Sequence, residues 1–158
     1  MLRPSFRSLR SERFRSMSEL RPSYNCEEVF GLVRLDVLRQ TELIANYVDS
    51  DRTLIAELGL HGPFCEIPEP LFLHRLHQSS SVVVTPSRQE RAVWFDPSKK
   101  GKLMFPHWRQ LGELFAAVQR SPLPFSEKVS CYGQMLHWSK RSRHRLGSDI
   151  SWAMRKLA

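Results

Sequence analysis

The sequence predicts an α/β fold, in which a partial sheet with flanking helices is followed by an all-helical C-terminal segment. Short apolar runs bounded by Gly, Pro or polar residues predict strands between residues 29 and 86. Apolar residues at helical spacing lie between these runs and prevail after Pro86. We therefore expect three segments: a basic irregular tail or stub of a missing domain (1–28), an α/β segment (29–86) and a helical extension (87–158).

The segment 29–86 alternates predicted strands with predicted helices. A short helix is expected over 35–41, and a second helix carries Leu54, Ile55 and Leu58 and ends at Gly62. The predicted strands are 29–33, 64–67, 71–77 and 82–84.

The segment after Pro86 is predicted to be helical. It opens with turn residues at 96–98 and a basic loop at 99–102. Amphipathic patterns then predict helices over 108–118, 125–136 and 146–157.

The positive charge of the chain is concentrated at its two ends. The formal net charge is +8, of which residues 1–23 hold +4, residues 24–138 hold −1 and residues 139–158 hold +5. A nucleic-acid-binding fold more often carries its basic residues on one structured face. We therefore expect no specific nucleic-acid binding, although the basic C-terminus could contact an anionic membrane surface. A solvated terminus is the alternative interpretation.

The cysteine spacing and the length of the apolar runs limit where in the cell we expect the protein to be. Cys26, Cys65 and Cys131 offer neither a zinc spacing nor a disulfide framework, and free thiols favour a cytoplasmic location. No apolar run approaches the roughly 20 residues that span a bilayer. The opening residues lack the apolar core of a secretory signal.

The stretch from Val29 to His77 carries a resemblance to a known family. It reads VFGLVRLDVLRQTELIANYVDSDRTLIAELGLHGPFCEIPEPLFLHRLH. Its order of strand, helix, isolated acid, helix and strand ending in Arg-Leu-His resembles the acceptor-side half of family 2 glycosyltransferases, the inverting enzymes of the GT-A fold. The resemblance implies a partial GT-A-like sheet that lacks the N-terminal nucleotide-sugar-binding half.

In this family an acid at a helix start takes the proton from the attacking acceptor hydroxyl. The resemblance assigns that role to Asp51, because direct displacement at an anomeric carbon requires a base within hydrogen-bond reach of the nucleophile. Ser50 stands where many members have Glu. The alternative is structural, because Asp or Ser before a helix is a favoured N-cap.

The remaining implied site residues bind substrate. Arg52 would contact the acceptor or a phosphate, and Arg75 with His77 would lie on the diphosphate side of the donor. Arg suits a phosphate because its planar fork donates two hydrogen bonds. Residues two apart on a strand share a face, so Arg75 and His77 could act together. A polar strand end in solvent is the alternative.

The donor and metal sites of such an enzyme have no counterpart here. No Asp-x-Asp motif precedes Val29, and residues 1–28 contain no glycine-rich phosphate loop. We therefore expect no autonomous transfer from a nucleotide sugar to a glycan or lipid acceptor. Mg²⁺ or Mn²⁺ would bind only if another chain completed the donor site.

Two further functions stay open at the level of sequence. One is a non-catalytic interaction or oligomerisation module, because a truncated α/β segment exposes a sheet edge and an apolar face to a second copy or a partner chain. The other is a basic-tailed adaptor that contacts RNA or lipid through its ends.

Overall fold

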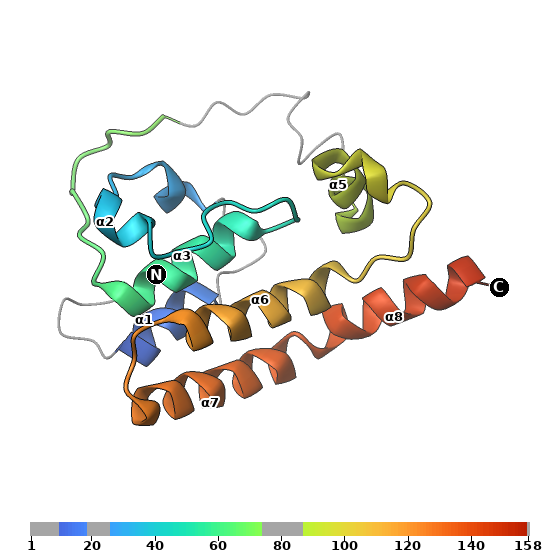
Figure 1. Ribbon diagram of the computed structural model, residues 1–158. Coiled ribbons are helices and arrows are strands. Elements are labelled where there is room, and N and C mark those ends of the chain that lie inside the picture. Colours follow the sequence, from blue (N-terminus) through green and yellow to red (C-terminus); the bar gives the residue numbers. More distant parts are fainter. Residues whose placement is uncertain (1–9, 19–25, 74–86, 158) are drawn as a thin grey trace.

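The protein folds as a set of packed helices in the computed structural model, which describes residues 10–18, 26–73 and 87–157 (Figure 1). The elements in chain order are α1 (Arg10–Ser18), η1 (Glu27–Phe30), α2 (Leu35–Leu38), α3 (Ser50–His61), α5 (Arg88–Phe95), η2 (Pro97–Lys99), α6 (Pro106–Arg120), α7 (Phe125–Arg141) and α8 (Arg143–Leu157), where η marks a 3₁₀ turn.

The expected α/β fold is wrong, because the described residues contain no strand and no sheet. The run 29–33 forms the end of the 3₁₀ turn η1 and an extended connection, and the runs 64–67 and 71–73 are irregular. The expected strand 82–84 and the end of the strand 71–77 lie outside the described residues. The GT-A-like sheet is therefore not part of this structure where the chain is described.

Two features of the described apolar runs agree with their lack of strand pairing. A central strand must bury its side chains, yet Leu32 is fully exposed and Leu71 is 69% exposed. Pro63, Pro68 and Pro70 also remove backbone donors that a ladder would need. Short apolar runs bounded by Gly or Pro thus do not predict strands when no neighbour is available to cover them.

The predicted helices around Leu54 and in the C-terminal segment are confirmed, whereas the helix expected over 35–41 is the single turn α2. Helix α3 ends at His61 before Gly62-Pro63, and α6, α7 and α8 cover the three C-terminal patterns. Residues 10–18, which we expected to be irregular, form α1. Helix α5 was also missed, although Ser87 and Glu90 form a capping box at its start.

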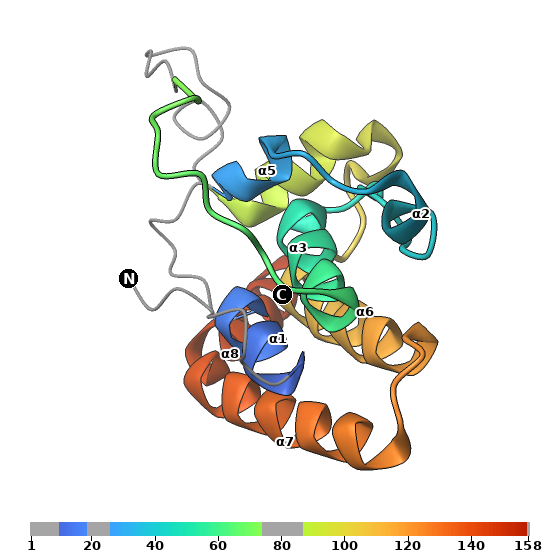
Figure 2. The same cartoon turned by 90° about the vertical axis from the view of Figure 1, so that its left-hand side faces the viewer.

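The core lies where α1 and α3 cover the antiparallel pair α6 and α7. Figures 1 and 2 show α1 between α3 and α7, with α6 packed against both α3 and α7. Phe14, Ile55, Leu114 and Met135, one from each of these helices, are at most 2% exposed. Burying a side chain of this size contributes roughly 1.5–3 kcal/mol, so this contact stabilises the fold without a sheet.

Helices α1 and α3 approach closely at Gly59. A Cβ atom at Gly59 would lie 3.5 Å from the backbone of Arg13, and the Arg13 Nε atom donates a hydrogen bond of 3.1 Å to the Gly59 carbonyl. That distance is an ordinary van der Waals contact, so an alanine would fit at position 59 against Arg13. The hydrogen bond from Arg13 thus joins α1 to α3.

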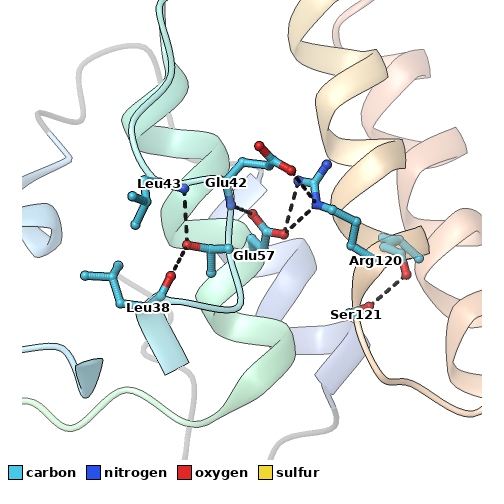
Figure 3. Close-up of polar contacts among 8 residues, drawn as sticks. Leu38, Glu42, Leu43, Glu57, Arg120 and Ser121 are labelled. Atoms are coloured by element: carbon cyan, nitrogen blue, oxygen red, sulfur yellow. Dashed lines mark hydrogen bonds and ion pairs between the residues drawn. The ribbon is translucent and has the colours of Figure 1, made fainter. Parts of the chain in front are cut away.

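A buried carboxylate joins α3 to the end of α6 (Figure 3). Glu57 is 1% exposed, and its Oε1 atom accepts hydrogen bonds from Nε and Nη2 of Arg120 at 3.3 and 3.1 Å. The backbone N–H of Glu42 donates to Glu57 Oε2 at 3.5 Å, and the Glu42 carboxylate lies 3.7 Å from Arg120 Nε. The burial of Glu57 is thus offset by a charge-assisted pair, as a buried acid requires.

A second buried carboxylate ties α8 to the start of α6. Asp149 is fully buried, and its Oδ2 atom accepts hydrogen bonds from the backbone N–H groups of His107 and Trp108 at 2.8 and 3.4 Å. Its Oδ1 atom lies 2.8 Å from His107 Nδ1. The Trp108 indole donates to the Leu146 carbonyl at 3.1 Å. Asp149 therefore caps a helix that is distant in sequence.

Candidate functional site

Two of the residues assigned by the resemblance, Asp51 and Arg52, lie in the first turn of α3. The N-cap position belongs to Asp49, whose backbone is left-handed (φ 65°) and whose side chain makes no capping hydrogen bond. Asp51 Oδ1 accepts a hydrogen bond of 2.8 Å from the Arg52 backbone N–H, and Arg52 Nε lies 3.7 Å from Asp49 Oδ1. Asp51 is therefore at a helix start, as expected, but not at the cap itself.

The surroundings of Asp51 make its ionisation less favourable. Burial raises the pKa of the Asp51 carboxyl, the Arg52 N–H hydrogen bond opposes this, and the charge of Asp49 raises the pKa further. A raised carboxyl pKa is a property that general bases use. A base must also face a space that can hold substrate, and Asp51 does not line the cavity described below.

The other assigned residues, Arg75 and His77, lie outside the described residues. The structure therefore brings together Asp51 and Arg52 and gives no distance from either of them to Arg75 or His77. No group of three His, Cys, Asp or Glu side chains in the described part of the chain is placed to hold a metal ion.

A cavity of about 320 Å³ lies between the loop before α3, the η2 loop and the start of α6. We call it the α6 cavity. Its buried floor includes Val48, Ala92 and Pro106, and the partly exposed Leu103 and Phe105 lie nearer its mouth. The volume falls at the small end of the range for ligand pockets, roughly 300–1,000 Å³.

The ionised side chains that line the α6 cavity are all basic. They are Lys99, Lys102 and Arg109, and none of the described lining residues is Asp or Glu. Lys99 Nζ lies 3.2 Å from Asp96 Oδ2 and donates to the Asn46 carbonyl at 3.3 Å. The Arg109 guanidinium stands 4.9 Å from the centre of the Tyr47 ring, and its Nε is 3.6 Å from Glu113 Oε1.

Tyr47 is a buried phenol at the edge of this cavity. Burial raises the pKa of Tyr47 to about 12, and a hydrogen bond with Thr53 opposes the rise. The phenol is therefore protonated at neutral pH. Its ring supports Arg109 through a cation–π contact, which orients the guanidinium next to the cavity.

A second feature is an apolar surface on the side of α6 and α7 that faces away from α1 and α3. We call it the outer face. Its α6 residues recur three and four positions apart, as do those of α7, and the ring of Phe115 stacks on that of Tyr132 at 5.1 Å. The outer face consists of Trp108, Leu111 and Phe115 from α6, and Phe125, Val129, Tyr132 and Leu136 from α7. Leu111 and Tyr132 are partly buried where this face meets the core, and the other five residues are exposed.

The outer face is left largely uncovered by the described residues. Phe125 is 81% exposed and Leu136 is 68% exposed. Gly112 and Gly133 are exposed within the same two helices, and a Cβ atom added at either one would meet no atom within 4 Å. Each mid-helix Gly costs about 1 kcal/mol relative to Ala, and no contact among the described residues offsets that cost.

The cysteines differ in exposure and offer no reactive pair. Burial raises the pKa of Cys26 to about 12 and that of Cys131 to about 11, so both thiols are protonated and unreactive at neutral pH. Cys65 is exposed. The buried thiols therefore act as small apolar groups in the core.

Sequence reasoning missed the α6 cavity because its walls come from segments far apart in the chain. The loop 99–102 was recognised as basic, but nothing in its sequence indicates that it lies against Tyr47 and Arg109. The capping box at Ser87 could have revealed α5, which contributes Ala92 to the floor. The apolar spacing in α6 and α7 was recognised, but spacing alone does not separate core from exposed positions.

Comparison with known proteins adds no relative. No protein-family model matches this chain, and searches of curated proteins and of solved structures found no similar protein. Membership of glycosyltransferase family 2 stays a prediction. In the described part of the chain, no helix combines the length and apolar character needed to cross a membrane.

Proposed function

We propose that this protein is a non-catalytic helical interaction module that self-associates through the outer face of α6 and α7. The observation that carries this proposal is the exposure of five large apolar side chains along a pair of helices whose opposite side forms the core. Large exposed apolar patches in small proteins mark interaction sites. The sugar-transfer activity implied by the resemblance, with Asp51 as base, stays a prediction that has lost the support of its expected sheet.

The composition of the outer face resembles that of a protein interface. Four of its seven side chains are aromatic, and aromatic residues are enriched at the centre of interfaces. Covering an exposed Phe or Leu contributes roughly 1.5–3 kcal/mol. Phe125 and Leu136 could therefore stabilise a complex more than they stabilise the monomer.

Charge favours a second copy of this chain as the occupant. The charged residues of 106–138 nearly balance, with Arg109, Arg120 and Lys128 against Glu113 and Glu127. Two identical copies can therefore meet here without strong repulsion. A two-fold arrangement would place α6 and α7 of one copy against α6 and α7 of the other. The four helices would then pack as a four-helix bundle, a common arrangement of amphipathic helices.

Gly112 and Gly133 fit the same arrangement. Small residues let two helix backbones approach closely, and both positions open onto empty space in the described monomer. A second copy would occupy that space and offset the cost of glycine in a helix.

A charge placed on the outer face tests the proposal. Leu136→Glu should convert the self-associated protein to a monomer, because it would bury a carboxylate at the centre of the contact. Leu71→Glu is the matched control, since Leu71 is 69% exposed and lies outside α6 and α7. Light scattering on a size-exclusion column gives the mass of each variant. Equal masses for the two variants would sink the proposal.

A glycine substitution separates association from monomer stability. Gly133→Ala should raise the free energy of monomer unfolding by about 1 kcal/mol because alanine has the higher helix propensity. The same variant should weaken self-association, because the new methyl group enters the contact. A stabilised monomer that associates as tightly as the parent would show that Gly133 does not lie in an interface.

A further inference from the structure

We propose that the α6 cavity binds a small amphipathic anion, an apolar body that carries one carboxylate or a similarly charged group. This inference goes beyond self-association, and none of the residues that line the cavity belongs to the outer face. It rests on the shape of the cavity, on the distribution of apolar groups within it and on the side chains that surround its mouth.

The interior of the cavity suits an apolar group. Val48 and Ala92 are buried at 3% and 7% exposure, and Pro106 closes the floor beside them. Such a floor holds water poorly, because no polar group of these residues' side chains binds a solvent molecule there. The aliphatic or aromatic part of a ligand would fill this space and pack against the apolar side chains.

The mouth of the cavity suits a negative charge. Lys102 is exposed there, and no ion pair links its ammonium to a described carboxylate. Lys156 of α8 adds charge nearby, since its Nζ atom donates to the Lys102 carbonyl at 3.0 Å. Asp96 and Glu113 pair with Lys99 and Arg109, whereas Lys102 and Lys156 have no described carboxylate partner. The balance leaves a local positive charge.

The loop that carries Lys99 and Lys102 is shaped for this position. Gly101 between them has φ +83°, a left-handed conformation that favours glycine. Lys102 N–H donates to the Lys99 carbonyl at 3.0 Å, which closes the turn. The turn places both Lys99 and Lys102 against the same cavity.

The anion-binding group must be a side chain rather than the N-terminus of α6. The backbone N–H groups of His107 and Trp108 are already bound to Asp149. An anion in the cavity would therefore depend on Lys102 and its neighbours. This dependence makes the inference testable with a single exposed residue.

The experiment compares two probes that share one apolar tail. Octanoate and octylamine are titrated into the full-length protein by calorimetry at low ionic strength. We expect saturable binding of octanoate, at least about fivefold tighter than that of octylamine, which is the size of an exposed charge contact. Amide shifts in an NMR spectrum should move at 99–105 and at Tyr47. Equal affinity for the two probes, or no saturable binding of octanoate, would overturn the proposal.

A matched pair of variants locates the site. Lys102→Glu should weaken octanoate binding by about tenfold or more, because it replaces an attractive charge with a repulsive one. Lys100→Glu makes the same change in the same exposed loop at a residue that does not line the cavity, and it should weaken binding less than about threefold. Equal weakening by both variants would show general attraction to a basic surface and would contradict a built site. Running both titrations in the Leu136→Glu background keeps the result independent of self-association.

Discussion

The raised pKa of Asp51 makes the stability of the folded protein depend on pH. Burial raises the pKa of its carboxyl, so the folded state holds this proton more tightly than the unfolded chain does. The contribution of Asp51 to stability is therefore most favourable below the ordinary carboxyl pKa. This contribution is lost as the pH rises, first through the pKa of the carboxyl in the unfolded chain and then through its higher pKa in the folded protein.

Replacing Asp51 removes this cost of ionisation. Asp51→Asn should raise the free energy of unfolding at pH 7, and the gain should shrink as the pH falls toward 4. Urea unfolding at the two pH values measures the difference. Asp36→Asn at an exposed aspartate is the control, and it should show no comparable change. A variant that is less stable than the parent at pH 7 would mean that Asp51 is held mainly by favourable charge contacts.

At the residue scale, sequence reasoning located Asp51 correctly at the start of a helix but could not identify its neighbours. The capping role was assigned to Asp51, two residues too late, because α3 begins at Ser50 and its N-cap is Asp49, whose backbone is left-handed. The roles of Arg75 and His77 stay predictions. Tyr47 carried no recognisable motif, although the structure places it between Arg109 and the α6 cavity.

Helix α6 depends on a cap that comes from another helix. Asp149 satisfies two backbone N–H groups at the start of α6 and contacts the His107 ring. The sequence before α6 offers Phe105, which cannot accept a hydrogen bond through its side chain. No local pattern could predict this, because the acceptor lies about forty residues away in the chain.

Removing the Asp149 carboxylate should loosen the contact between α6 and α8. Asp149→Asn should lower the free energy of unfolding by about 2–3 kcal/mol, because a buried amide cannot accept all the hydrogen bonds that the carboxylate accepts. Thermal and urea unfolding measure the loss, with Asp36→Asn as the control. A change below about 0.5 kcal/mol would show that solvent, rather than Asp149, satisfies the start of α6.

Element prediction succeeded for long amphipathic patterns and failed for short apolar runs. The helices α6, α7 and α8 follow apolar residues spaced over about three turns, a signal that tertiary contacts rarely override. The runs 29–33, 64–67 and 71–77 are too short to distinguish a strand from an apolar loop. The resemblance to a glycosyltransferase favoured the strand assignment, and packing does not support it.

At the scale of the whole molecule, the helices bury one core and leave apolar surface outside it. The core is complete when α1 and α3 cover one side of α6 and α7. The opposite side keeps most of its apolar residues exposed, and the basic C-terminal residues lie at the end of α7 and in α8. This division explains why the interaction module remains the better supported of the functions that the sequence left open.

The most direct measurement is sedimentation equilibrium of the unmodified protein across a range of concentrations. The chain has a mass of 18.5 kDa, and the account predicts a mass that rises with concentration toward that of two chains. The rise should survive moderate salt, because apolar contacts rather than charges hold the copies together. A folded protein whose mass stays at 18.5 kDa throughout would contradict the account.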